Sequence, residues 1–523
     1  MTPGLKYLIE GSLYDQFAAA FDPDTATDAQ LAPYAGMFFE FDGSRRVTRE
    51  IVSAAGCSVC SGGQGEFTFA YATNPLAGPS PGYNTWVQKT TETLPDGNQN
   101  TVYTNILGQV LVSIHVETGS GLEWVTGYQY DSAGRVVAVY APSAVTGYDE
   151  SLPDLLGLNE ANSPYIRDAA GLVTIYDYAG FTTATATEGG SAADYLDGWA
   201  IQRGEFGTAV PQESMSYVSR TATGLTTYHV ATDTVYANED GTGARTTSYS
   251  YSWYTDSQQA YSVTTTMPIV STAHNGPGVA ASSTVVFDTD GRAVWTKDAD
   301  GFITYTEYDQ ATGSVVKMIS DVDTTQTSTF ANLPSGWATP SGGGLHLTTS
   351  YEYDAEGRTT KSVDAKGNVT YTVYRDGGRE VRTYAGWDST TNRPTGPTSV
   401  YKVDPDGRFS DSLTMSAAPA VDGSGRPTGA EAISDIESWT RTQHNAAGQA
   451  TATDTFFDLT GVTYSTATPT LGVQNTNFLR TTQDYDKQGR PNKSVSSAGT
   501  IYRTEYDGLG RVVSEWVGTD DTP

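Results

Sequence analysis

Two cysteines, Cys57 and Cys60, have the spacing in this chain that most directly suggests chemistry. They lie in the Gly/Ser-rich stretch SAAGCSVCSGGQG, residues 53–65. A redox dithiol would need a helix N-terminus to lower the thiol pKa, whereas this stretch predicts a loop. A zinc site would need two more ligands, and the five histidines are scattered along the chain. A short disulfide that closes the loop is the favoured interpretation, and free thiols are the main alternative.

An acidic stretch from Thr296 to Glu307 matches part of an EF-hand calcium loop. Asp298, Asp300 and Glu307 stand where such a loop carries ligands. The first ligand position holds threonine, and the flanking residues predict strands, not the helices of an EF-hand. A β-turn ending at Gly301 explains the same residues, so the turn is favoured and calcium binding is the alternative.

Motifs of enzymatic chemistry are missing from the sequence. It has no Gly-x-Ser-x-Gly elbow, no His-Glu-x-x-His pair and no Walker-type phosphate loop. Sixty carboxylates leave a glycosidase pair open, but nothing in the pattern singles one out. The sequence therefore predicts a protein without catalytic activity and without a cofactor.

The strands expected in this chain recur at short, regular intervals, most clearly in residues 351–384. Runs of β-branched and aromatic residues, typical of strands, alternate with Asp-x-x-Gly corners about every ten residues. Aspartate can accept hydrogen bonds from the backbone of its own turn, and glycine can adopt the positive φ that closes it. Strands joined by such short corners must be antiparallel.

The same unit recurs as an aromatic residue followed by Asp-x-x-Gly-Arg, at a full period of 21 residues where it is most regular. Its copies use Tyr130, Asp131, Gly134 and Arg135; Phe287, Asp288, Gly291 and Arg292; Tyr308 and Asp309; Tyr353, Asp354, Gly357 and Arg358; Tyr485, Asp486, Gly489 and Arg490; and Tyr506, Asp507, Gly510 and Arg511. Looser copies begin at Asp404 and, with asparagine, at Asn445. Periods of this size indicate a repeat architecture. Repeated residues usually serve the repeat, so we expect ladders of side chains along the sheet in preference to a sugar-binding surface.

This pattern resembles the YD-repeat family, also called Rhs repeats, most clearly over residues 285–515. The resemblance implies an all-β fold: a YD-repeat antiparallel β-spiral, forming a shell or tube of stacked hairpins. The family includes bacterial surface proteins, the cocoons of polymorphic toxins, insecticidal toxin complexes and the teneurin shell. Cys-x-x-Cys-x-Gly-Gly segments similar to the one around Cys57 also occur in its bacterial surface proteins. Toxin shells end in a self-cleaving Asp-Pro-x-Gly segment. Asp404-Pro405-Asp406-Gly407 has those letters, but repeats continue beyond it, so we interpret it as a corner.

The composition excludes several classes of function. Thirty basic and sixty acidic residues give a formal net charge of −30, which argues against binding to nucleic acid or to anionic lipid. No apolar run is long enough to span a membrane, so no direct membrane insertion is expected of this segment. No capping unit follows the last repeat, and we expect the chain to be a segment of a larger protein.

Four regions follow from these patterns. Residues 1–65 form an N-terminal segment with the cysteine loop, residues 66–140 degenerate repeats, residues 141–220 an irregular insertion with degenerate strands, and residues 221–523 the main repeat spiral. Within the insertion, Ser151 to Leu158 has the composition of a helix start.

The favoured function is a non-catalytic structural segment of a large bacterial extracellular or cell-surface protein, such as a fibre, tube or adhesin scaffold. The alternatives are the encapsulating shell of an Rhs-type toxin and a carbohydrate-binding surface module. The expected partners are neighbouring repeats of the same larger chain, with self-association through open strand edges as a further possibility.

Overall fold

The computed structural model describes residues 6–9, 17–18, 20–31, 34–53, 64–158, 163–486, 489–506 and 511–521. The chain divides into two compact units. Unit 1 comprises residues 1–69, 94–96 and 349–523, and unit 2 comprises residues 70–93 and 97–348. Each unit is described by itself.

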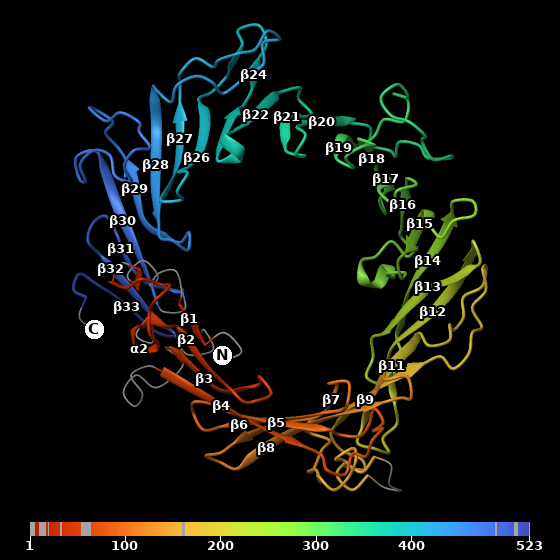
Figure 1. The fold of residues 1–523 in the computed structure, drawn as a ribbon. Helices are drawn as coiled ribbons and strands as arrows, with labels where there is room; N and C mark the ends of the chain where they lie inside the picture. Colours follow the sequence, from red (N-terminus) through yellow and green to blue (C-terminus); the bar gives the residue numbers. More distant parts are fainter. Residues whose placement is uncertain are drawn as a thin grey trace. The chain divides into compact units, whose positions relative to one another are not determined.

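Unit 2 consists of antiparallel strands that pair in chain order, drawn in orange to green in Figure 1. Its strands are β5 (Gln88–Thr93), β6 (Gln99–Thr104), β7 (Val110–Glu117), β8 (Leu122–Tyr130), β9 (Val136–Tyr140), β10 (Leu172–Tyr178), β11 (Leu196–Arg203), β12 (Val210–Ala222), β13 (Leu225–Tyr236), β14 (Ala244–Trp253), β15 (Ala260–Thr266), β16 (Ser282–Phe287), β17 (Ala293–Lys297), β18 (Ile303–Tyr308) and β19 (Val315–Ser320). A single 3-10 turn, η2 (Thr272–His274), interrupts the described strands.

Unit 1 is built in the same way, with β23, β26, β27, β28, β29 and β30 lying side by side (Figure 1). Its strands are β1 (Tyr7–Leu8), β2 (Met37–Phe41), β3 (Val47–Ser53), β21 (Thr359–Val363), β22 (Val369–Arg375), β23 (Glu380–Tyr384), β24 (Trp387–Asp388), β25 (Arg393–Pro394), β26 (Thr398–Val403), β27 (Phe409–Met415), β28 (Ile436–His444), β29 (Ala450–Phe456), β30 (Phe478–Tyr485), β31 (Pro491–Val495), β32 (Ile501–Tyr506) and β33 (Val512–Gly518). Two strands, β4 (Gln64–Thr73) and β20 (Leu347–Tyr353), carry residues of both units. The helical elements of unit 1 are α2 (Asp28–Leu31) and η3 (Asp376–Gly378).

The all-β, antiparallel hairpin fold expected from the repeat is confirmed in both units. The hairpin over 351–384 forms as predicted, since Tyr351 pairs with Ser362 and Lys361 pairs with Tyr371. Within residues 141–220, strands β10, β11 and β12 continue the antiparallel pairing. Among the described residues, no helix is both long and apolar enough to span a membrane.

Each unit buries apolar side chains beneath the loops that cross one sheet face. In unit 2, one cluster centres on Tyr103 and Val112, and a second centres on Trp295 and Ile303. In unit 1, the cluster joins Leu413, Trp439 and Phe456 with loop residues such as Tyr464 and Leu471. Loops therefore supply the second layer that a lone sheet would lack.

The predicted helix start at Ser151 is wrong, because residues 151–158 form consecutive turns. Asp154 accepts hydrogen bonds from the backbone nitrogens of Leu156 and Gly157, and Leu155 has a left-handed φ of 67°, which a helix does not permit. The turns insert Leu155 and Leu156, both fully buried, into the first cluster of unit 2.

Candidate functional site

The motif residues form one hydrogen-bonded corner. At Asp288–Arg292, Asp288 Oδ1 accepts from the backbone nitrogens of Asp290 (3.0 Å) and Arg292 (2.9 Å), and Oδ2 accepts from Arg292 Nε (2.7 Å). Gly291 completes the turn with a φ of 81°. Burial raises the pKa of Asp288, but the hydrogen bonds from Arg292 outweigh it and hold the pKa below its usual range. The same aspartate–arginine fork recurs at Asp131–Arg135, Asp354–Arg358, Asp404–Arg408 and Asp486–Arg490.

The aromatic residue and the arginine of the motif connect consecutive hairpins. The guanidinium of Arg292 lies over the ring of Tyr308 at 5.0 Å, and Tyr308 Oη donates to the carbonyl of Ala293 (3.0 Å). At the end of unit 1, Arg490 covers Tyr506 at 4.7 Å, and the Tyr506 hydroxyl donates to the carbonyl after that arginine (2.9 Å). Arg135 over Tyr178 and Arg358 over Tyr374 repeat the stacking. The tyrosine and arginine that recur in the motif therefore make contacts between neighbouring hairpins. Asp507 and Gly510 lie outside the described residues.

Two corners replace the ion pair with neutral amides. At Asn445–Gln449, Asn445 Nδ2 donates to Gln449 Oε1 (2.8 Å), and Gln449 Nε2 donates to the carbonyl of Gly489 (2.9 Å). The corner at Asn105–Gln109 has the same pattern, with bonds of 2.8 Å and 2.9 Å. The sequence analysis missed the Asn105 corner, although its Asn-x-x-Gly-Gln spacing matches that at Asn445.

We expect the corner at Asn445–Gln449 to form an aspartate–arginine ion pair only when both residues are substituted together. Asn445→Asp/Gln449→Arg should rebuild the fork, whereas each single change removes a matched partner. In a double-mutant cycle by urea denaturation, the coupling should favour the pair by about 0.5 to 1 kcal/mol. If the effects of the two single substitutions on stability were simply additive, the amide corner and the aspartate–arginine corner would not be equivalent.

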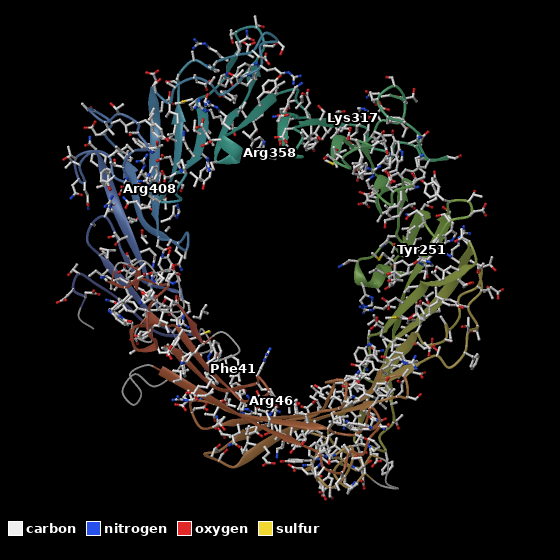
Figure 2. All side chains as sticks on the ribbon, in the orientation of Figure 1. Phe41, Arg46, Tyr251, Lys317, Arg358 and Arg408 are labelled. Atoms are coloured by element: carbon white, nitrogen blue, oxygen red, sulfur yellow. The ribbon has the colours of Figure 1, made fainter. Side chains whose placement is uncertain are left out.

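A further corner, at Asp42–Arg46, carries arginine where the motif has glycine. Asp42 Oδ1 accepts from the backbone nitrogen of Arg46 (3.0 Å) and Oδ2 from Arg46 Nε (2.8 Å), while Arg45 has a φ of 67°. Arg46 is labelled in Figure 2. A side chain in this left-handed conformation carries a steric cost that glycine avoids.

Arg45→Gly is therefore expected to stabilise the protein by about 1 kcal/mol. The thermal midpoint should rise relative to the wild-type chain. Arg46→Gly, which removes the fork at the same corner, should lower it. An Arg45→Gly midpoint equal to or below the wild-type value would show that this residue carries no backbone strain.

The other predicted site residues are not brought together. Asp298 Oδ1 accepts from the backbone nitrogens of Asp300 (3.0 Å) and Phe302 (2.8 Å), as a turn requires. Glu307 instead pairs with Lys317 (2.5 Å), on the neighbouring strand β19. Over the described part of the chain, no three His, Cys, Asp or Glu side chains are grouped to hold a metal ion. Cys57 and Cys60 lie outside the described residues.

Asp233 on β13 of unit 2 has a raised pKa. Burial, followed by repulsion and a hydrogen bond from Glu213, raises the pKa of Asp233. Glu213 in turn accepts from the indole nitrogen of Trp199 (2.8 Å). A raised carboxyl pKa means that the folded state holds this proton more tightly than the unfolded state. Its stabilising effect is thus present at low pH and is lost as the pH rises through the folded pKa.

Asp233→Asn should accordingly stabilise unit 2 at about pH 7 and change little in acid, near the ordinary carboxyl pKa. The gain should be below about 1 kcal/mol, because the site is partly solvated. Urea midpoints at the two pH values measure it. Asp177→Asn, at an exposed position of β10, serves as the control. Equal effects of Asp233→Asn at both pH values would contradict the raised pKa of Asp233.

Unit 2 also contains a cavity and a stacked aromatic pair. A cavity of about 960 Å³ in unit 2 is lined by strand ends including Leu172, Ile201, Arg203 and Tyr236. Tyr251, labelled in Figure 2, stacks on Trp253 at 5.4 Å and donates to the carbonyl of Val230 (2.8 Å). These aromatic faces thus already have protein partners.

A row of alternating charges crosses seven adjacent strands of unit 1. Directly opposed residues in register are, in order, Arg375, Glu380, Lys402, Asp411, Arg441, Asp454 and Arg480. The side chains of Asp411, Arg441 and Asp454 are 0% exposed. The row was not predicted from the sequence, because its members lie on separate strands and β23, β28 and β30 each carry a second charged residue.

Against the effect of burial, hydrogen bonds lower the pKa of Glu380 in the row and of Glu431 in the covering loop. Burial raises the pKa of Glu380, but hydrogen bonds from Lys402 and Arg382 lower it below the usual value. Burial likewise opposes ionisation of Glu431, a loop residue, and hydrogen bonds from Tyr384 and the backbone of Ala420 reverse the shift. The pair of Asp411 and Arg441 is completed by the indole of Trp439 (2.7 Å) and the hydroxyl of Tyr464 (3.0 Å), both donating to Asp411.

Comparisons with known proteins give likenesses of fold at low similarity. No family model and no curated protein sequence matches the chain. Among solved structures, a TcdB2–TccC3–Cdc42 complex matches 92% of this chain and 27% of that chain, at 13% identity and a TM-score of 0.27. The Photorhabdus luminescens Tc holotoxin pore matches 92% and 25%, at 13% identity and 0.26. A porin-like protein from Bacteroides uniformis matches 57% and 88%, at 11% identity and 0.17. The chain thus spans about a quarter of the length of the toxin-complex chains that it matches.

Proposed function

We propose that this chain is a non-catalytic structural segment, a β-sheet wall within a larger bacterial extracellular or cell-surface protein. The observation that carries the proposal is the use of the repeat residues. The aspartate, glycine, arginine and tyrosine of the motif bond to one another or to the next hairpin, as at Asp288, Arg292 and Tyr308. Residues engaged in this way support a continuous wall.

The encapsulating shell of an Rhs-type toxin is the second candidate. One observation favours it: the two faces of the sheet from β23 to β30 differ in character. Loops 416–435 and 457–477 pack over the face that carries Leu413 and Trp439. The opposite face presents hydroxyl groups, such as Thr414 and Ser438, which hydrogen bond to each other at 2.7 Å. A wall with a distinct inside and outside needs two such faces.

Electron microscopy of the natural full-length protein, combined with surface labelling of intact cells, tests the proposal. A labelled surface protein with extended sheet walls supports the fibre or scaffold, and a closed body that contains a separate domain supports the shell. An unlabelled cytosolic protein with reduced thiols would overturn the extracellular role. Binding on a glycan array would favour the third interpretation from the sequence, carbohydrate recognition.

A further inference from the structure

We propose that the buried ion pairs of unit 1 fix the register of strands that long loops cannot align. Short corners set the register of a hairpin by themselves, because turn type and loop length leave one pairing. Three junctions in this region lack such corners. β23 reaches β26 through residues 385–397, β27 reaches β28 through 416–435, and β29 reaches β30 through 457–477.

The ion pairs bridge these three junctions. Lys402 joins Glu380 across β23 and β26 at 2.7 Å, Arg441 joins Asp411 across β27 and β28 at 2.8 Å, and Arg480 joins Asp454 across β29 and β30 at 2.5 Å. A longer contact of 3.3 Å also connects Arg375 to Glu380 at the short η3 connection.

The two short-corner junctions between them differ. Lys402 stands opposite Asp411, and Arg441 stands opposite Asp454, in direct register. Among the residues that the structure describes, no ion pair within 4.0 Å joins either couple. The corners at Asp404–Arg408 and Asn445–Gln449 already align these strands. From β23 to β30, all three junctions made by long loops thus carry an ion pair, whereas the two short corners between them do not.

Apolar packing alone would leave a choice of register at these junctions. The row beside the charges is apolar, and Val400 opposes Leu413 while Phe456 opposes Phe478. A shift by two residues keeps apolar side chains on the covered face, since side chains alternate with a period of two. The same shift would place buried Asp411 away from Arg441 and leave two charges without partners. A buried polar group that penalises wrong pairings is the best-attested use of such groups.

Arg441 also holds a loop that covers its ion pair. Arg441 Nη1 donates to the carbonyl of Thr468, and Nη2 donates to the carbonyl of Ser465, both at 2.8 Å. Its guanidinium lies 4.0 Å from the ring of Phe409. Tyr464 of the same loop donates to Asp411, so loop 457–477 contacts both partners of the ion pair and fits the native alignment of β27 and β28.

Disulfide trapping across β27 and β28 tests the proposal in a full-length chain with Cys57→Ser and Cys60→Ser. Thr414→Cys/Ser438→Cys reports the native register, because these residues are directly opposed. Thr414→Cys/Thr440→Cys reports a slip of two residues. Oxidation followed by peptide mass spectrometry gives the ratio of slipped to native cross-links.

Asp411→Leu/Arg441→Leu removes one of the three ion pairs and leaves the other two intact. We expect a folded chain in which the ratio of slipped to native cross-links rises at least ~10-fold. If this variant loses cooperative melting, Asp411→Asn/Arg441→Gln, which keeps polar groups without charge, replaces it with the same expectation. Native cross-links alone in the folded variant would overturn the proposal.

The matched control is an ion pair across a short corner. Glu352 pairs with Lys361 at 2.8 Å across β20 and β21, which the corner at Asp354–Arg358 joins. In Glu352→Leu/Lys361→Leu, cysteines at Tyr351 and Ser362 report the native register and cysteines at Tyr351 and Thr360 a slip. No slipped cross-link is expected. Equal slipping in both variants would show a general effect of lost charge and would also overturn the proposal.

Discussion

Replacing Arg441 alone by leucine is expected to lower the free energy of unfolding of unit 1 by about 3 to 5 kcal/mol, because Asp411 would remain buried without its cation. Asp411 and Arg441 are both 0% exposed and lie 2.8 Å apart. Urea denaturation followed by far-ultraviolet circular dichroism measures the loss.

Two variants serve as controls for this prediction. Asp411→Leu/Arg441→Leu should lose much less stability, because removing both charges leaves no orphan. Arg426→Leu breaks an ion pair whose partners, Arg426 and Glu352, are 47% and 41% exposed, and should cost below about 1 kcal/mol. A loss for Arg441→Leu no larger than that for Arg426→Leu would contradict the burial of the row.

The second large effect is expected at Trp295 in unit 2, where alanine should cost about 3 to 5 kcal/mol. Trp295 is 1% exposed, packs against Tyr305 and Phe330, and donates to the carbonyl of Ala331 (3.2 Å). Its loss would leave a cavity beneath the loop that closes this cluster. The thermal midpoint and the urea midpoint both measure it.

The matched control is Trp124→Ala, since this tryptophan is in the same unit but is 41% exposed. It should cost far less than Trp295→Ala. Similar losses at both positions would mean that the cluster around Trp295 does not carry the stability of its part of the sheet.

The corners could be predicted from the sequence because their chemistry is local. Aspartate, glycine and arginine within five positions specify one turn, and the strands between turns follow from the rhythm. Arg45 shows the limit of the pattern: the Asp42-Gly43 dipeptide predicts a hairpin turn there, but only the structure shows that arginine adopts the conformation of the motif glycine.

The buried charges could not be predicted, because they meet across long loops. No local rule brings Asp411 to Arg441, or Asp454 to Arg480, through segments such as 416–435 and 457–477. The helix start predicted at residues 151–158 was wrong because tertiary packing decides the structure there as well. Helix-start composition was outweighed by the burial of Leu155 and Leu156 in the core of unit 2.

The account depends most on the corners that tie each hairpin to the next, and an experimental density map of the chain tests it directly. The map should show the Asp288–Arg292 fork, the Arg292 guanidinium over Tyr308, and the Tyr308 hydroxyl on the carbonyl of Ala293. Helices across residues 285–320, or Gly291 in the middle of a strand, would contradict the wall and the structural role proposed for it.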